Sequence, residues 1–319
     1  MKDLISVLTT IYNEPLSWVK ECIDSVVAQE HPNYNIEIII VIDNPFLDSS
    51  YITELNNYIN SLIVENNNVV TIYNKVNIGL AASLNKAFAN SKGQYIARID
   101  TDDICAVERF YKQHDFLLRN NDVSIVGGHI IRIDEDGNEI GRAKNSLSFE
   151  DISNKIYYKS VCYHPTWMMR RVVFESLSGY RTYPNSQDFD FLLRAYENNY
   201  KISNVDDFVV SYRIRKSSLS FTHSLRQRKC QEHILKMSRK RLKDVEVYDE
   251  KLMMKEVQSS SFYNKCHAFS QDLFYRAMVL MKNRNVLFPF YLMASILMSP
   301  AQFRYVIRQV RFYIISRCK

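Results

Sequence analysis

The sequence lacks several features by which whole classes of protein are recognised. It has six cysteines but no Cys-x-x-Cys pair and no histidine at ligand spacing beside a cysteine. This argues against a zinc site or a disulfide framework and favours a reduced, cytoplasmic setting. The longest apolar run, 286–298, has 13 residues and contains Pro289, whereas a membrane-spanning helix needs about 20. Only five apolar-leaning residues follow Lys2-Asp3, so we expect neither a signal peptide nor a membrane span.

Apolar and charged residues are nevertheless abundant, and the charges are unevenly distributed. Apolar residues make up 46% of the 319 residues and aromatic residues 13%, which is enough for a core and excludes a disordered chain. Residues 1–200 carry 18 Lys or Arg and 26 Asp or Glu, a net charge of −8, whereas residues 201–319 carry 23 and 9, a net charge of +14. We expect one large domain or two medium ones, with different roles for the acidic and basic parts.

Short β-branched segments alternate with helix-like segments over residues 1–130. Strands are expected at 4–9, 36–42, 69–73, 94–99 and 123–126, and helices at about 16–29, 51–63, 80–91 and 107–120. Because these strands are apolar at nearly every position, they predict an α/β fold with an open parallel sheet of the nucleotide-binding kind, covered by helices. Ligands bind such sheets beyond the carboxyl ends of the strands.

After residue 127 the pattern predicts a β-hairpin, a strand, a helix and a further strand. Their positions are, in order, 130–140 with the turn Asp136-Gly137, 161–169, 189–196 and 208–214. Beyond residue 220 the chain is expected to be mainly helical. Between Arg213 and Lys243 it carries 11 basic residues against one acidic residue, Glu232.

Three aspartates directly follow the expected strand 94–99, in the segment Asp100-Thr101-Asp102-Asp103. Residues two apart on an extended chain point to the same side, so Asp100 and Asp102 would both face the cleft. Two hard carboxylates there suit Mg²⁺ or Mn²⁺ together with a diphosphate. The alternative is that one of the aspartates caps the helix expected from about Ala106.

Two other strand ends carry polar side chains. Thr10, Tyr12 and Glu14 would share one side of an extended chain, where a planar base could stack on Tyr12. The alternative there is an ordinary strand-to-helix loop with Pro15 in the first helical turn. Asp43 follows the second strand, where it would either accept a hydrogen bond from a base edge or serve only as a turn residue.

Further candidates lie between residues 160 and 223. Asp190 has Arg194 four residues on and is expected to form an ion pair on the helix surface. Asp188 has no such partner, and the helix dipole favours its ionised form in the first helical turn. It would act there as a general base or simply complement the dipole. His164 and His223 are isolated histidines, which are more often structural than ligands.

In their order along the chain, these segments resemble the family 2 glycosyltransferases with the GT-A fold, the inverting enzymes that build bacterial surface polysaccharides such as the O-antigen, lipopolysaccharide and capsule. The likeness covers about residues 1–215 and implies a Rossmann-like open mixed sheet flanked by helices. It rests on the segments Ser6 to Glu14, Glu37 to Asp43, Asn77 to Asn85, Gly93 to Asp103, Gly179-Tyr180-Arg181 and Gln187 to Asp190.

The resemblance implies a role for each candidate residue. The implied roles are contact with the nucleotide-sugar for Thr10, Tyr12, Glu14, Asp43, Asn77, Asp100 and Asp103; binding of Mn²⁺ or Mg²⁺ by Asp102 and Asp100 of the DXD motif; catalytic base for Asp188; and the acceptor side for His164 and Gln187. The uracil of a UDP-sugar would be held by Thr10, Tyr12 and Asp43, and Asp103 would lie near the donor sugar.

The chain departs from the family pattern at four points. Ile42-Asp43-Asn44-Pro45 stands where the family has Asp-Asp-Gly-Ser, and Gln187 replaces a glutamate. Arg215 replaces a histidine that would offer a third protein ligand to the metal. The Gln-x-x-Arg-Trp motif and membrane spans of processive synthases are missing, so one sugar per acceptor is expected.

The reaction implied by the resemblance is a single inverting displacement. Asp188 would deprotonate an acceptor hydroxyl, which attacks the anomeric carbon of the UDP-sugar while the metal neutralises the departing UDP. An α-linked donor would give a β-linkage, and galactose or glucose in β-1,3 linkage is expected. The family also implies an acceptor sugar carried on a polyprenyl diphosphate, at the cytoplasmic face of the bacterial plasma membrane.

Two domains are expected. Residues 1–220 would form the catalytic domain, with a nucleotide-sugar half (1–103) and an acceptor half (104–220). Residues 221–319 would form a basic helical extension. Basic and aromatic residues alternate near the carboxyl end at Arg304, Arg308 and Arg311. This pattern suits an interfacial helix on anionic lipid, while the alternative is a helical cap with a solvated basic face.

Two alternatives to a catalytic role remain open. The first is a nucleic-acid-binding protein using the basic run from Arg213 to Lys243. Recognisable signatures of that class are missing and the acidic part would have no role, so no nucleic-acid partner is expected. The second is a non-catalytic nucleotide-sugar-binding partner of a glycosyltransferase.

Overall fold

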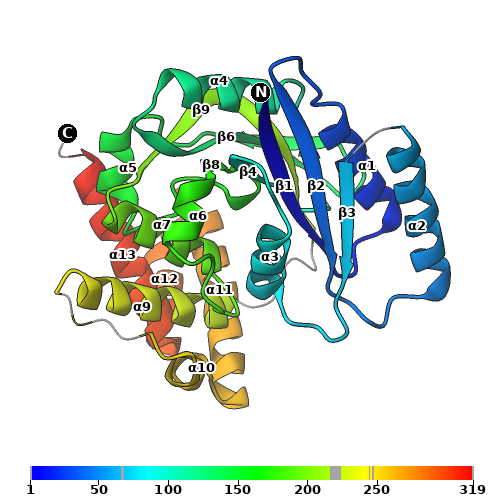
Figure 1. Ribbon diagram of the computed structural model, residues 1–319. Coiled ribbons are helices and arrows are strands. Elements are labelled where there is room, and N and C mark those ends of the chain that lie inside the picture. Colours follow the sequence, from blue (N-terminus) through cyan, green and yellow to red (C-terminus); the bar gives the residue numbers. More distant parts are fainter. Residues whose placement is uncertain (1, 66–67, 216–223, 244, 246–247, 318–319) are drawn as a thin grey trace. The chain divides into compact units, whose positions relative to one another are not determined.

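The computed structural model describes residues 2–65, 68–215, 224–243, 245 and 248–317 (Figure 1). It divides into two compact units, which are Met1–Ile156 with Ser160–Arg215, and Tyr157–Lys159 with Lys216–Lys319. The boundary expected near residue 220 and the isolated His223 lie outside the described residues. Each unit is therefore considered by itself.

A nine-stranded mixed sheet forms the centre of the first unit, in the order β3-β2-β1-β4-β8-β6-β9-β5, with β7 beside β6. The first four strands in this order are parallel, and β8 runs antiparallel to both β4 and β6. The prediction of an α/β fold with a mixed sheet is confirmed. The strands are β1 (Asp3–Ile11), β2 (Tyr34–Ile42), β3 (Asn68–Tyr73), β4 (Tyr95–Arg98), β5 (Ile104–Cys105), β6 (Val123–Ile133), β7 (Glu139–Ala143), β8 (Met168–Arg170) and β9 (Lys201–Arg213).

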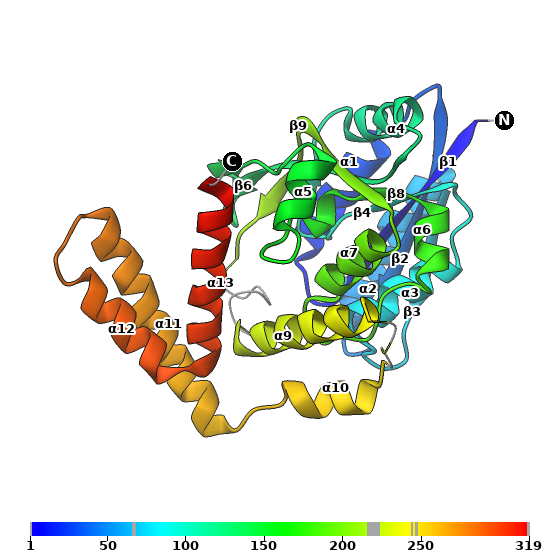
Figure 2. The ribbon, with the colours of Figure 1, turned by 90° about the vertical axis from the view of Figure 1, so that its left-hand side faces the viewer.

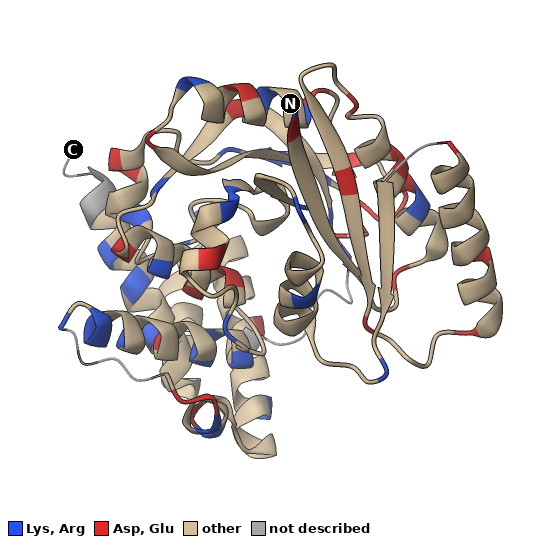
Figure 3. Ribbon diagram, in the orientation of Figure 1, with Lys and Arg blue, Asp and Glu red and all other residues tan. Residues whose placement is uncertain are grey.

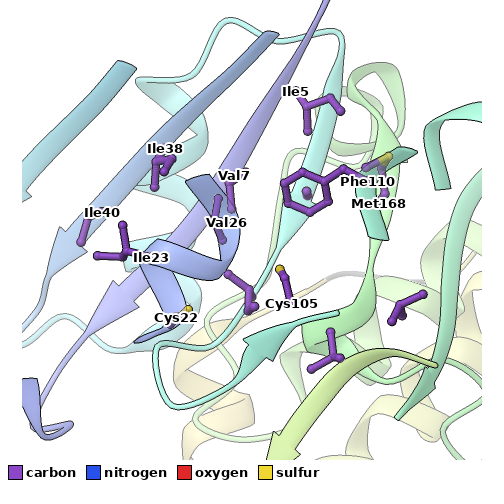
Figure 4. Packing of buried hydrophobic residues seen from close by; sticks show 14 of the residues in the cluster. Ile5, Val7, Cys22, Ile23, Val26, Ile38, Ile40, Cys105, Phe110 and Met168 are labelled. Carbon is purple, nitrogen blue, oxygen red and sulfur yellow. The ribbon is translucent and has the colours of Figure 1, made fainter. Parts of the chain in front are cut away.

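Helices cover both faces of the parallel strands because alternate side chains point to opposite faces. Ile38 and Ile40 of β2 join Ile23 and Val26 of α1 in one apolar cluster (Figure 4). The intervening side chains of β2 face the other way, toward α3, which packs against β1 and β2. The helices of this unit are α1 (Leu16–Val27), α2 (Ser49–Val64), α3 (Leu80–Ala89), α4 (Arg109–Arg119), α5 (Phe149–Lys155), α6 (Arg171–Ser176) and α7 (Gln187–Glu197).

Two expectations about local structure are wrong. Residues 161–169 do not form one strand: the 3-10 turn η1 (His164–Thr166) precedes the short β8, because Pro165 has no backbone N–H to give to a sheet. No aspartate of 100–103 caps a helix either. The next helix, α4, begins only at Arg109, after Glu108 in the left-handed region with φ 60°.

The second unit is helical in its described part, as expected. Its helices are α9 (Ser224–Arg241), α10 (Glu250–Val257), α11 (Ser261–Lys282), α12 (Phe288–Met298) and α13 (Pro300–Arg317). Figure 2 shows α11 and α12 side by side, and their backbones are joined by Ser270 and Ser295. Each serine hydroxyl donates to the carbonyl oxygen of the other residue at 2.8 Å. Among the described helices, none combines the length and the apolar character that a bilayer crossing requires.

Candidate active site

The parallel arrangement brings the carboxyl ends of β1, β2, β3 and β4 to one edge of the sheet, and the candidate residues follow these ends. In the segment that follows β4 in the chain, the Asp100 carboxylate forms an ion pair with Arg98. Asp102 Oδ2 lies 3.1 Å from Nε of Arg215, and the same guanidinium lies 3.2 Å from Glu14 Oε1. The guanidinium of Arg215 therefore joins the segments that follow β1 and β4.

Negative charge is concentrated behind β4. Burial and the charge of Asp100 raise the pKa of Asp102 to about 6, although Arg215 acts in the opposite direction. Asp103 is 1% exposed, and burial with its two acidic neighbours raises its pKa well above the usual value. Its Oδ1 accepts the backbone N–H of Arg213 at 2.9 Å, which links this segment to β9. Contact between Asp103 and a donor sugar stays a prediction.

The chain turns after β1 instead of staying extended. Glu14 folds back, so that its Oε2 accepts the backbone N–H groups of Tyr12 at 2.8 Å and Asn13 at 3.2 Å. The Glu14 carboxylate is nearly buried, whereas Tyr12 is 46% exposed. The prediction that the side chains of Thr10, Tyr12 and Glu14 lie on one side of an extended chain is therefore wrong. Tyr12 presents its ring to solvent, Thr10 is half-buried, and Glu14 faces Arg215.

Asp43 fixes the loop in front of α3. It is buried, and its Oδ1 accepts Asn74 Nδ2 at 2.8 Å and the Ile78 N–H at 2.9 Å, while Oδ2 accepts the Gly79 N–H at 2.8 Å. Asn77 is exposed and also accepts from the Gly79 N–H, at 3.0 Å. A carboxylate has about four acceptor positions, so three protein contacts leave Asp43 about one for a base.

Asp188 is the second residue of α7 and is half-buried. Burial raises its pKa, the charge of Asp100 raises it further, and hydrogen bonds from the backbone N–H groups of Asp188 and Phe189 only partly offset this. Burial therefore outweighs the helix dipole, which favours the ionised form in this first helical turn. A carboxylate with a raised pKa is a stronger proton acceptor than an ordinary aspartate, which suits a general base. The adjacent Gln187 is 8% exposed.

His164 lies in the core next to Tyr180. Its Nε2 is 2.8 Å from the Tyr180 hydroxyl, and its ring meets the edge of Trp167 at a centroid distance of 4.7 Å. Burial lowers the pKa of His164 well below its usual value, so the imidazole is neutral at physiological pH. Burial raises the pKa of Tyr180, the charge of Arg98 lowers it, and the charge of Asp188 raises it. An acceptor-side role for His164 stays a prediction.

The ion pair between Asp190 and Arg194 forms as expected but is not on the surface. Arg194 Nε lies 2.8 Å from Asp190 Oδ2, and the two residues are 4% and 0% exposed. The guanidinium also donates to the carbonyl oxygens of Leu177 and Gly179, at 2.7 and 2.8 Å. The pair therefore anchors α7 to residues 177–179, the segment that follows α6 in the chain. Asp188 lies in the first turn of the anchored helix.

Sequence reasoning missed Arg98 as a residue of this site. Arg98 is 2% exposed, ends the apolar strand β4 and pairs with Asp100. An arginine inside an apolar strand pattern was the available signal, because a buried guanidinium needs a counter-charge. Arg215 was noted only as a departure from the family pattern, and its contacts with Asp102 and Glu14 come from the fold.

The residues behind β4 fit a divalent cation by their chemistry. Within the described ranges, no group of three or more His, Cys, Asp or Glu side chains forms a ready-made metal cluster. Asp102 is nevertheless an oxygen donor with a side chain that is 14% exposed, and burial and the charge of Asp100 raise its pKa. A cation here would take its remaining ligands from a diphosphate and from water.

Residues 6–178 match the family described as glycosyl transferase family 2. The chain belongs to this family. The glycosyltransferase is 32% identical over 214 residues to the uncharacterized glycosyltransferase MJ1057 of Methanocaldococcus jannaschii, covering 67% of this chain and 71% of the relative. It is 30% identical over 237 residues to the O-antigen biosynthesis glycosyltransferase WbnJ of Escherichia coli, covering 70% of this chain and 89% of the relative.

Solved structures support the GT-A fold of this glycosyltransferase. The mannosyltransferase PcManGT of Pyrobaculum calidifontis, in complex with GDP-Man and Mn²⁺, has a TM-score of 0.59 at 12% identity, over 97% of this chain and 88% of that one. S. aureus TarS 1–349 in complex with UDP-GlcNAc has a TM-score of 0.53 at 17% identity, over 85% and 81%. Another TarS structure is longer, and the present chain covers 54% of it.

Proposed function

We propose that the chain is a metal-dependent, inverting hexosyltransferase that moves one sugar from a UDP-sugar to a sugar carried on a lipid diphosphate. The observation that supports it best is Asp188. Its carboxyl group has a pKa raised by burial and by Asp100, and it starts a helix anchored by a buried ion pair. A proton acceptor is thus held rigidly beside the acidic segment behind β4.

In the proposed reaction Asp188 accepts the proton of an acceptor hydroxyl as that oxygen bonds to the anomeric carbon. The bond between this carbon and the diphosphate oxygen breaks in the same step, UDP leaves with the electron pair, and the configuration inverts. The exposed Tyr12 ring would stack on the uracil. Asn77, Thr10 and the remaining acceptor position of Asp43 would supply polar contacts to the nucleotide, and Gln187 and His164 would lie on the acceptor side.

Asp102 and Asp100 are the proposed residues for holding Mn²⁺ or Mg²⁺. Such an ion would supply positive charge for the diphosphate of the leaving group. Asp102 gains most from it, because its carboxylate has an acidic neighbour and a raised pKa. Arg215 already provides one cation beside Asp102, so a metal ion held there would share this carboxylate with the guanidinium.

The donor and acceptor are proposed from the family and its named relatives. O-antigen biosynthesis appears in the name of WbnJ, and amylovoran biosynthesis in that of AmsE of Erwinia amylovora, which is 29% identical over 214 residues. We expect galactose or glucose in β-1,3 linkage. The test is a screen of UDP-sugars against lipid-diphosphate GlcNAc and GalNAc, with the anomeric configuration of the product determined by NMR. A β-linked product supports the proposal, whereas an α-linked product or transfer only from GDP-sugars would contradict it.

Peripheral attachment to an anionic membrane at the cytoplasmic face is proposed from α12. Four large apolar side chains of this helix are exposed, namely Phe290 at 69%, Met293 at 57%, Leu297 at 77% and Met298 at 39%. Apolar side chains on a helix with basic neighbours favour an interfacial position. In co-sedimentation with vesicles of phosphatidylglycerol and phosphatidylethanolamine, Phe290→Asp and Leu297→Asp should each lower binding. The control Val64→Asp alters an exposed apolar residue of α2 and should not, and equal binding by all variants would contradict attachment through α12.

A further inference from the structure

A cavity of about 550 Å³ lies inside the second unit, between α9, α13 and the pair Tyr157-Tyr158. This is within the range of volumes of pockets that bind small organic molecules. Figure 3 shows Lys and Arg along α9 and α13, the two helices that line it. The charged residues of its lining are Arg228, Arg239, Arg304, Arg308, Arg311 and Glu232. Five cations against one carboxylate give the lining a charge of +4.

The lone carboxylate of this lining is already in use. Glu232 Oε1 accepts Arg304 Nε at 2.7 Å. Arg308 donates to the neutral Gln231 at 2.8 Å, and Arg228 lies over the Tyr305 ring, 4.2 Å from its centroid. Within the described residues, no carboxylate forms an ion pair with Arg228, Arg239, Arg308 or Arg311.

The partly buried Arg228 and Arg308 therefore share the charge of one carboxylate, Glu232, which is already paired with Arg304. Burial lowers the pKa of Arg228 to about 10, and the nearby charge of Arg308 acts in the same direction. Burial also lowers the pKa of Arg308, whose Nε is buried without a hydrogen-bond partner among the described residues. A cation removed from water without an anion costs free energy, and an anionic ligand would recover it.

The rest of the cavity is apolar. Leu235 and Leu242 of α9 and Ile307 of α13 line it, together with the aromatic Tyr157 and Tyr158. A free phosphate or pyrophosphate ion would contact the guanidinium groups and leave these apolar side chains without a partner. A ligand with an anionic head and an apolar chain would contact both parts.

We propose that this cavity binds a phosphate or diphosphate monoester of an apolar alcohol, with the anionic head among Arg228, Arg308 and Arg311 and the chain against Leu235, Leu242 and Ile307. The cavity would then hold the carrier part of a lipid-linked acceptor, so this inference deepens the proposed function and rests on its acceptor class. Arg308 and Arg311, for which the sequence predicts contact with anionic lipid, would contact an individual head group here.

The test is calorimetric titration of the full chain with three probes: farnesyl diphosphate, inorganic pyrophosphate and farnesol. We expect farnesyl diphosphate to bind at least tenfold more tightly than either of the others. Arg308→Gln should weaken both diphosphates at least fivefold, and Ile307→Ser should weaken farnesyl diphosphate alone. The exposed Arg311→Ala provides a second variant that leaves the helix packing intact. Arg276→Ala removes one exposed charge of α11 outside the cavity and should change nothing.

Two results would overturn the inference. Equal affinity for pyrophosphate and farnesyl diphosphate would mean that the cavity binds only the phosphate groups and not the apolar chain. Farnesyl diphosphate binding that is unchanged by Arg308→Gln, Arg311→Ala and Ile307→Ser would put the ligand elsewhere. Because these titrations contain no donor sugar, their failure leaves the transfer reaction at Asp188 untouched, and failure of transfer leaves this binding test valid.

Discussion

Removing the guanidinium of Arg194 should destabilise the first unit strongly. Arg194→Met removes the closer of two cations beside the Asp190 carboxylate, which is 0% exposed, and leaves Arg181 at 3.8 Å. It also deprives the carbonyls of Leu177 and Gly179 of their donors. Breaking a buried pair from one side costs about 3–5 kcal/mol. At about 2–4 °C per kcal/mol for a unit of this size, Tm should fall by about 6–20 °C.

Tryptophan fluorescence can follow the unfolding of the first unit by itself. Trp18 and Trp167 both belong to the first unit, and Trp167 contacts Phe191 of α7 at a ring-centroid distance of 5.9 Å. Thermal unfolding of the full chain, followed by tryptophan fluorescence, therefore reports on the unit that carries Arg194.

The matched control is the pair Asp115–Arg119 on α4, which has the same residue types, the same spacing and a distance of 3.0 Å, but lies on the surface. Arg119 is 73% exposed, so Arg119→Met should cost less than about 1 kcal/mol. If the two Arg→Met variants shift Tm equally, burial does not determine the strength of these pairs, and the anchoring of α7 by Arg194 is wrong.

Three further predictions concern the site itself. Asp43→Ala should lower the free energy of unfolding by about 2–4 kcal/mol in urea titrations, because the Ile78 N–H loses its acceptor and the Gly79 N–H and Asn74 each lose one of two. A loss below 0.5 kcal/mol in the same titration would argue against this role. Because the pKa of Asp188 is raised and its ionised form is the base, activity is lost as pH falls through that raised value, so the acid limb of kcat/KM should lie above the ordinary aspartate pKa of about 3.9. The reasoning fails if the limb lies at or below it. Arg215→Gln removes the guanidinium beside Asp102 and should tighten Mn²⁺ binding several-fold in calorimetric titrations, whereas unchanged affinity would mean that the two cations do not share this carboxylate.

The sequence predicted those parts of the structure that depend on local pattern. The parallel strands, the hairpin of β6 and β7 and the helices of the second unit follow from apolar periodicity and turn residues. The DXD segment and Asp188 could be identified because each lies at the end or start of an element with a recognisable pattern. Their assigned roles remain predictions.

Contacts between distant segments could not be predicted. Arg215 and Glu14 are 201 positions apart in the chain, and only the fold brings them together at Asp102. The spacing of Asp190 and Arg194 predicted their pairing but not their burial, because the two carbonyl acceptors that enclose Arg194 come from the segment behind α6. The raised pKa of Asp188 likewise depends on burial, which the position in the first helical turn does not reveal.

The central claim is that Asp188 is the proton acceptor of a glycosyl transfer reaction. The most direct test compares wild-type chain and Asp188→Asn for UDP-sugar affinity and for turnover with a lipid-diphosphate-linked acceptor. Asp122→Asn, at an exposed site, is the control. We predict unchanged UDP-sugar affinity and a fall in kcat of about 10²–10⁴-fold, the usual contribution of a general base. Turnover by Asp188→Asn close to the wild-type rate would contradict the account.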